Sequence, residues 1–204
     1  GTTVALDYQA PDPAVVVDHH ESLEGEVHNP TTNSIDGVVS VTPRSSAVQY
    51  AERLLAASER SPWNSYKGET WGSSLAWTSS VSYLTEVTED ASLWIDPASD
   101  HLSFRVGQVF RSRGQNPSGQ NQDLEVRLID AAGESSPWVP VSGYAPIFPP
   151  WQTAEGGIKT VMGGVRIPVS AFTSIDATAL HQIEFRFQVQ ATGELVFDDI
   201  RFSR

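Results

Sequence analysis

Regular alternation of apolar and polar residues in four separate segments is the feature that most constrains the fold of this chain. The segments span residues 101–110, 123–130, 164–172 and 181–190. Because successive side chains of a strand point to opposite faces, each segment predicts a strand with one apolar and one polar face. Such strands are typical of antiparallel sheets, since strands of a parallel sheet are usually apolar on both faces.

The rest of the chain is consistent with a jelly roll. Residues 111–122 and 143–157 form long connections rich in Gly, Pro, Asn and Ser, which favour turns. One segment, residues 45–60, has apolar residues at helical spacing and is followed by Pro62, so it predicts a short helix. We therefore expect an all-β fold, an antiparallel β-sandwich of the jelly-roll type with one short helix, in which residues 1–204 form a single domain.

Composition excludes several classes of function. The chain has 13 basic and 25 acidic residues and a net charge of -12, which disfavours nucleic acid and anionic membrane surfaces as partners. No apolar run is long enough to insert into a membrane, and the absence of cysteine excludes disulfides and thiolate chemistry. The acidic, cysteine-free composition favours a secreted or cell-surface bacterial protein, although a cytosolic protein could share it.

Charged residues occupy the polar positions of the alternating segments. If the four strands are neighbours in one sheet, these side chains form a band of alternating charge. That band is either a solvated face held by ion pairs or a groove in which guanidinium groups grip a ligand. The residues are Arg105, Arg127, Arg166 and Arg186, with Glu125 and Glu184 between them. For the second interpretation, the candidate ligand-binding residues are Arg105, Arg127 and Arg186.

Aromatic residues concentrate in two loop-rich stretches. They are Trp63, Tyr66 and Trp71 in the first stretch, and Trp138, Tyr144, Phe148 and Trp151 in the second. Aromatic rings in loops either form platforms for sugars or close the open ends of the sandwich. We take Trp138, Tyr144 and Trp151 as candidate ligand-binding residues. Trp77, by contrast, alternates with Leu75 and is expected in the core.

The last segment, residues 192–204, changes its apolar register across two adjacent aspartates. Leu195 and Phe197 precede Asp198 and Asp199, and Ile200 and Phe202 follow them. This change predicts a β-bulge or a ligand at the aspartates. If the first and last strands pair, Asp198 could meet Asp18 or Glu21 and form a structural calcium site. Otherwise, Asp198 accepts hydrogen bonds from backbone amides at the bulge.

Two motifs carry a resemblance to a known group of proteins. Residues 166–172, "RIPVSAF", and residues 196–202, "VFDDIRF", resemble strands of galactose-binding-like or carbohydrate-binding-module-like jelly rolls. Such modules are C-terminal accessory domains of secreted bacterial hydrolases, and the resemblance is strongest over residues 75–204. It implies a calcium ion bound by Asp198, with Asp18 or Glu21 as the partner carboxylate.

Three functions remain open at this point. The first is a noncatalytic carbohydrate-binding or accessory module of an extracellular protein, whose partners are a glycan and a catalytic domain of the same parent protein. The second is a polysaccharide lyase or glycosidase, in which Arg105, Arg127 and Arg186 neutralise uronate carboxylates while a Tyr or His abstracts a proton. The third is a structural spacer.

Overall fold

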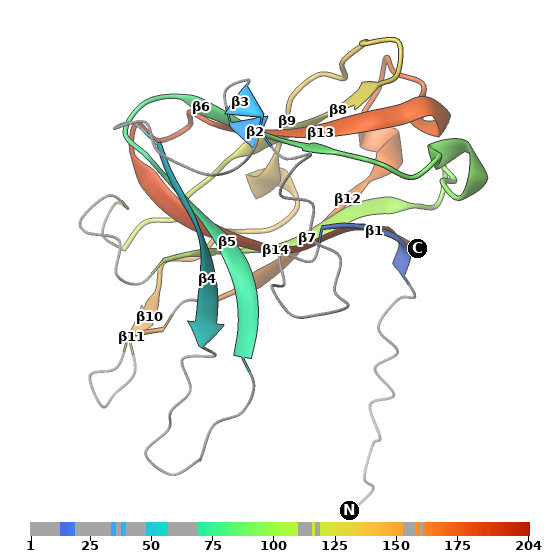
Figure 1. Cartoon of the computed structure of the whole chain (residues 1–204). Coiled ribbons are helices and arrows are strands. Elements are labelled where there is room, and N and C mark those ends of the chain that lie inside the picture. The colour runs from blue at the N-terminus through green and yellow to red at the C-terminus, as the bar shows by residue number, and fades with distance from the viewer. Residues whose placement is uncertain are drawn as a thin grey trace, which may run out of the picture.

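The chain forms a sandwich of two antiparallel sheets, seen as two layers in the computed structural model (Figure 1). This confirms the predicted antiparallel β-sandwich. The structure describes residues 13–18, 34–35, 38–39, 48–56, 69–109, 116, 119–152, 158–159 and 161–204.

The β14 sheet contains six strands in the order β12-β7-β14-β5-β4, with β1 also paired to β14. Its strands are β1 (Pro13–Asp18), β4 (Val48–Ala56), β5 (Glu69–Trp77), β7 (His101–Gln108), β12 (Gly163–Pro168) and β14 (Gly193–Ser203).

The β13 sheet also contains six strands, in the order β3-β2-β6-β13-β8-β9. Its strands are β2 (Ser34–Ile35), β3 (Val38–Val39), β6 (Val81–Glu86), β8 (Glu125–Asp130), β9 (Val139–Pro140) and β13 (Leu180–Phe187). A separate hairpin pairs β10 (Trp151–Gln152) with β11 (Ile158–Lys159).

The predicted alternation sets the boundary between the core and the outer faces. In β8 and most of β13, every second residue is buried and the residues between are half-buried. Phe185 of β13 packs against Phe104 and Phe197 of the opposite sheet, with ring centroids 5.3 and 5.5 Å apart. Trp77 is fully buried, as predicted, and its indole N–H donates to the carbonyl of Gln190 at 3.1 Å.

The prediction of a helix within residues 45–60 is wrong for Val48–Ala56, because these residues form strand β4. All nine residues of β4 pair with β5, from Val48 opposite Trp77 to Ala56 opposite Glu69. Isolated short helices are marginal in water, so this ladder of sheet pairing overrides a weak helical preference.

Among the described residues, the only helical elements are 3-10 turns of three residues each: η1 (Ala91–Leu93), η2 (Val141–Gly143), η3 (Val169–Ala171) and η4 (Ala177–Ala179). No helix in the part of the chain that the structure describes is long and apolar enough to cross a membrane.

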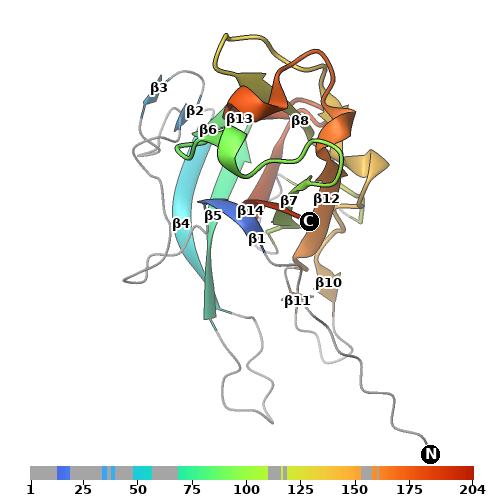
Figure 2. The same ribbon diagram turned by 90° about the vertical axis from the view of Figure 1, so that its right-hand side faces the viewer.

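Strand β14 carries the predicted bulge. Asp198 pairs with Arg105 of β7 and Arg201 pairs with Ser103, so two residues of β14 face only one residue of β7 between these pairs. Within the bulge, Asp199 has a positive φ of 55°, a left-handed conformation that Asp tolerates better than most residues. The second half of β14 also pairs with β1, and Figure 2 shows β1, β14, β7 and β12 side by side.

Candidate functional site

The two sheets divide the arginines that the sequence groups together. Arg105 and Arg166 lie on β7 and β12 of the β14 sheet, whereas Arg127 and Arg186 lie on β8 and β13 of the β13 sheet. The four arginines therefore do not form a single band, because their strands are not neighbours in one sheet. The strands are not all neighbours, because the chain moves between sheets from β7 to β8 and from β12 to β13.

On the β13 sheet, each arginine is paired with a glutamate directly opposite it. Arg186 donates to Glu125 Oε2 from Nε at 2.9 Å and from Nη2 at 2.6 Å. Arg127 Nε donates to Glu184 Oε2 at 2.6 Å. These pairs follow from the register of β8 and β13, which places Glu125 opposite Arg186 and Arg127 opposite Glu184.

The indole of Trp138 lies against both of these arginines. Its ring centroid is 4.0 Å from Arg186 Cζ and 4.5 Å from Arg127 Cζ, which is within the range of cation–π contacts. We call the surface formed by Glu125, Arg127, Glu184, Arg186 and Trp138 the paired face. The structure thus brings three candidate ligand-binding residues together, but their charged groups and ring are engaged with one another. This supports the interpretation of a solvated face held by ion pairs.

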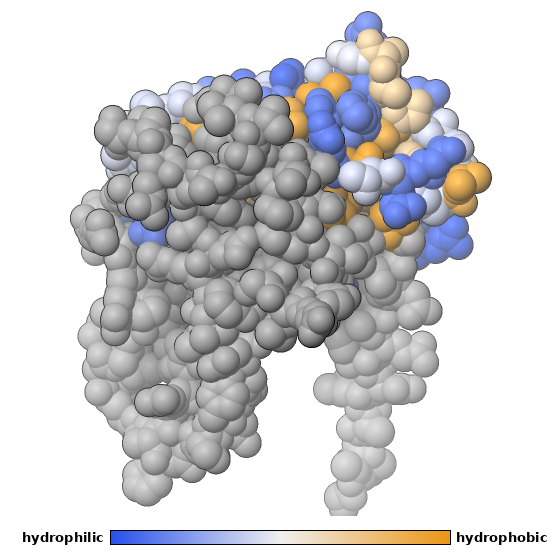
Figure 3. Space-filling model, viewed as in Figure 1, coloured by the Kyte–Doolittle hydropathy of each residue, from blue (hydrophilic) through white to orange (hydrophobic). Residues whose placement is uncertain are grey.

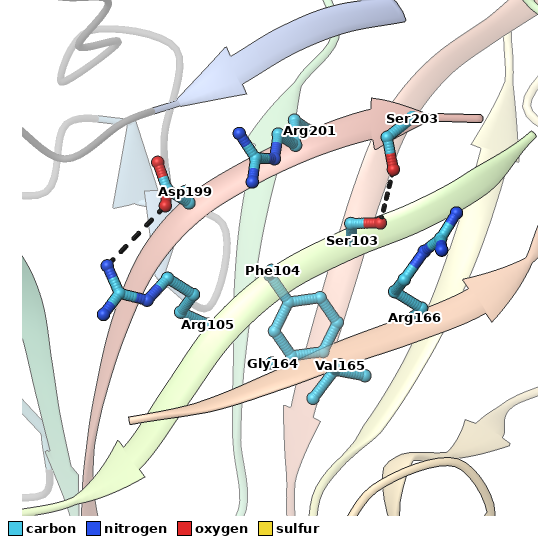
Figure 4. A pocket seen from close by; sticks show the side chains of 9 residues that line it. All are labelled: Ser103, Phe104, Arg105, Gly164, Val165, Arg166, Asp199, Arg201 and Ser203. Atoms are coloured by element: carbon cyan, nitrogen blue, oxygen red, sulfur yellow. Dashed lines mark hydrogen bonds and ion pairs between the residues drawn. The ribbon is translucent and has the colours of Figure 1, made fainter. Parts of the chain in front are cut away.

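On the outer face of the β14 sheet, a groove of about 290 Å³ crosses three strands (Figure 4). Its lining residues come from β7, β12 and β14. They are Ser103, Phe104, Arg105, Gly164, Val165, Arg166, Asp199, Arg201 and Ser203. We refer to this set as the groove.

Arg105 is held at one side of the groove by the two aspartates of the bulge. Its Nη1 lies 3.1 Å from Asp198 Oδ2 and 3.8 Å from Asp199 Oδ2. The Asp198 side chain is 2% exposed and the Arg105 side chain is 42% exposed, so the pair joins a buried carboxylate to a half-exposed cation. The double aspartate thus positions the Arg105 guanidinium beside the groove.

The other two arginines of the groove have fewer contacts. Arg166 Nη2 lies 3.4 Å from His101 Nδ1. For Arg201, no hydrogen bond or ion pair of the guanidinium is found within the described part of the chain. Arg201 is a functional candidate that is not among the residues predicted from the sequence, although the change of register that predicts the bulge also predicts that Arg201 points outward.

Small polar groups complete the groove. The hydroxyls of Ser103 and Ser203 lie 2.8 Å apart, and either can be the donor. At Gly164, an added Cβ would meet no atom within 4 Å, so this position opens the groove rather than serving close packing.

The predicted calcium site stays a prediction. The β1–β14 pairing places Asp18 opposite Ile200, as expected if the first and last strands meet. However, Asp198 faces the Arg105 guanidinium, and the described residues include no cluster of three or more groups suited to a metal. The side chain of Asp18 and all of Glu21 lie outside the described residues. Within the described residues, therefore, the donor set does not by itself fit calcium.

The remaining aromatic candidates are dispersed. Tyr144 is 43% exposed beside η2, and Phe148 is 49% exposed. Trp151 begins β10, but its side chain lies outside the described residues, as do Trp63, Tyr66 and the side chain of Trp71. In the described part of the surface seen in Figure 3, hydrophilic residues are interspersed with smaller hydrophobic areas.

Among the described residues, Asp96 and Asp130 have a lowered pKa, and both lie at turns outside the groove. Hydrogen bonds from the Ser99 hydroxyl and the Ala98 amide lower the pKa of Asp96. The pKa of Asp130 is lowered mainly by the Asp176 amide, with help from the amides of its own turn. Both shifts favour the ionised carboxylate, so these groups stabilise turns rather than supply protons.

Comparisons with known proteins define the class of fold. No family model and no curated protein sequence match the chain. Among solved structures, the family 11 carbohydrate-binding module of the cellulosomal cellulase Lic26A-Cel5E of Clostridium thermocellum is similar at 10% identity, with a TM-score of 0.51 over 96% of both chains. The fold is therefore that of a carbohydrate-binding-module jelly roll, as the sequence resemblance implies.

Two further structures are similar at lower scores. A family 30 carbohydrate-binding module matches at 12% identity and a TM-score of 0.47, over 74% of this chain and 73% of that chain. The agarase AgWH50C matches at 13% identity and a TM-score of 0.49, over 95% of this chain and 26% of the agarase chain.

Proposed function

We propose that this chain is a noncatalytic glycan-binding module and that the groove is its binding surface. The observation that carries the proposal is the groove itself. It is an open depression lined by hydrogen-bonding side chains, on the outer face of a sandwich with the fold of a family 11 carbohydrate-binding module. The paired face is a weaker candidate because its charges already satisfy one another.

The groups that line the groove suit a sugar. A sugar hydroxyl both donates and accepts hydrogen bonds, and the groove offers guanidinium donors and the Asp199 carboxylate, while the buried hydroxyls of Ser103 and Ser203 bond each other beneath them. Its volume of about 290 Å³ lies at the small end of the usual range for ligand pockets, roughly 300–1,000 Å³. We therefore expect it to hold a short stretch of a longer polymer.

The composition of the groove argues for binding rather than cleavage. A polysaccharide lyase needs a base such as Tyr or His beside the uronate, and neither occurs among the described lining residues. A glycosidase needs two carboxyl groups on opposite sides of the scissile bond. Here, Asp199 lines the groove while its neighbour Asp198 is buried against Arg105, and both lie on the same strand.

An extracellular accessory role fits this proposal. The similar family 11 module belongs to a cellulosomal cellulase, and the acidic, cysteine-free composition of this chain is compatible with export. In this proposal, the module holds a catalytic domain of the same parent protein close to a polysaccharide.

Affinity electrophoresis of the full chain tests the proposal. Gels would contain neutral β-glucan, xylan, agarose or acidic polysaccharides, and polymer length would be measured in parallel. We expect retention on at least one polymer without shortening. Shortening of a polymer would contradict the noncatalytic role, and mobility unchanged by every polymer would leave only a spacer.

A groove-filling variant locates the binding surface. Gly164→Leu places a side chain in open space within the groove without a clash in the fold, so retention should fall while the melting temperature stays close to that of the unaltered chain. Gly143→Leu is the matched control, because an added Cβ there also meets nothing and Gly143 lies in η2, outside the groove. Equal retention by both variants would place binding elsewhere.

A further inference from the structure

We infer that the groove selects an anionic glycan, one whose sugars carry carboxylate or sulfate groups. This inference rests on the proposed glycan-binding function and specifies the chemical class of ligand. It comes from the balance of charge in the groove, the partners of each arginine and the burial of the one aromatic side chain in the lining.

The groove has an excess of positive charge on a strongly acidic protein. Among the described residues, Arg105, Arg166 and Arg201 line it, against one carboxylate, that of Asp199. Even when the buried Asp198 is included, three guanidinium groups face two carboxylates, whereas the whole chain has a net charge of -12. A concave positive site within a negative surface attracts anions locally and repels them elsewhere.

Arg201 supplies a cation that no described carboxylate neutralises and for which no other side-chain partner is found among the described residues. The bulge places Asp198 and Arg201 on the same face of the sheet, because β14 has one extra residue between them relative to β7. In Figure 4, Arg201 lies along the groove between Asp199 and Ser203, while Arg166 rises from the opposite side. A guanidinium in this position can donate two parallel hydrogen bonds to a carboxylate or sulfate.

The groove offers little for the stacking of a neutral sugar. Phe104 is the one aromatic residue in its described lining, and only 2% of Phe104 is exposed because the ring packs into the core against Phe185. Stacking on a flat ring is therefore not available from the described lining. Charge and hydrogen bonding remain as the means of recognition, and these favour an ionised sugar over a neutral one.

Pairs of polymers that share a backbone and differ in charge provide the test. Polygalacturonate is compared with its fully methyl-esterified form, which has the same backbone without the carboxylates. κ-Carrageenan is compared with its desulfated form, which has the same backbone without the sulfate groups. Full-length protein is examined by affinity electrophoresis and by calorimetric titration. We expect binding to the charged member of at least one pair, weakened by added salt because the arginines are partly exposed. Which pair discriminates identifies carboxylate or sulfate.

Two variants of equal charge assign that preference to the groove. Arg201→Gln should weaken binding of the charged polymer about tenfold, the usual effect of losing a charge-assisted hydrogen bond. Arg186→Gln removes the same charge from the paired face and should leave binding unchanged, provided its melting curve shows a folded protein. Binding weakened equally by both variants would reflect net charge alone and overturn the inference.

Asp199→Asn gives an effect of opposite sign, which damage to the fold cannot imitate. Asn tolerates the positive φ at this position, and the substitution removes the one carboxylate in the described lining. We therefore expect tighter binding of the charged polymer, by about threefold from the loss of one partly screened charge.

The outcomes separate this inference from the proposed function. Equal binding to both members of each pair, or binding to neutral β-glucan or xylan alone, would overturn the inference and leave the glycan-binding proposal intact. Absence of binding to every polymer would overturn both. A charge preference that survives Arg201→Gln would also overturn the inference, because the preference would then arise outside the groove.

Discussion

The two outer faces of this sandwich both carry arginines, but the arginines have different surroundings on each face. On the paired face, every arginine meets a glutamate directly opposite it, and Trp138 lies against both guanidinium groups. In the groove, Arg105 alone contacts Asp198 and Asp199, Arg166 contacts His101, and the Arg201 guanidinium has no partner among the described residues. The presence of arginine on a strand therefore says little about binding, and the decisive property is whether the sheet also supplies its partner.

Register explains the difference between the faces. The β8–β13 ladder is regular across the four charged residues, so opposite charges fall into matched positions. In the β14 sheet, the bulge shifts one half of β14 relative to β7, which places Asp198 beside Arg105 and Arg201 beside Ser103. In the regular β8–β13 ladder, each of the four charged side chains lies opposite one of the other sign. In the interrupted β14–β7 ladder, Arg201 lies opposite Ser103 instead, so its guanidinium can bind a ligand.

The largest expected effect on stability comes from a substitution in the core between the two sheets. Gly193→Ala would place a Cβ well inside van der Waals contact with the buried Trp77 ring, which itself packs on Phe187 of the other sheet. Overpacking against such a rigid ring should lower the free energy of unfolding by about 3 kcal/mol in chemical denaturation. Gly164→Ala is the matched control and should be nearly neutral, and equal losses would contradict this account of the core.

A substitution at the bulge tests the backbone conformation on the groove side of the sandwich. Asp199→Val puts a β-branched residue at a φ of 55°, and we expect a loss of about 2 kcal/mol relative to Asp199→Asn. Denaturation of both variants measures the difference. If Val and Asn are equally stable, the left-handed conformation of the bulge is not maintained in solution.

On the paired face, loss of an arginine should affect stability and not binding. Arg186→Ala removes two hydrogen bonds to Glu125 and one contact with Trp138, so we expect a loss of about 1 kcal/mol by chemical denaturation, with glycan retention unchanged. If Arg186→Ala abolished glycan retention without lowering stability, the paired face and not the groove would be the binding surface.

The smallest expected effect on stability is that of calcium, whose predicted ligand is the buried Asp198 beside Arg105. The sequence predicts that calcium raises the melting temperature and that Asp198→Ala, which also lowers that temperature, abolishes the rise, because a ligand bound only by the folded state stabilises it. Differential scanning fluorimetry with calcium or a chelator measures both. If calcium does not change the melting temperature of the unaltered chain, the prediction is wrong.

Local patterns in the sequence predict the strands and the bulge, but not which strands become neighbours. Alternation alone identifies β8 and β13, and the change of register at Asp198 identifies the bulge in β14. Strand order depends on contacts between distant segments, such as β7 with β14, so it was not evident that Arg105 and Arg127 lie on opposite sheets. The nine residues of β4 resemble a helix because their apolar residues fall at helical spacing, while their pairing with β5 leaves no signal in the local sequence.

Nuclear magnetic resonance titration of the labelled chain with a short glycan of the best retained polymer tests the central claim most directly. We expect shifts of backbone amides in the three strands of the groove, at residues 103–105, 164–166 and 199–203, while the amides of β8 and β13 remain unchanged. Shifts confined to residues 125–130 and 182–187 would place binding on the paired face and contradict the account.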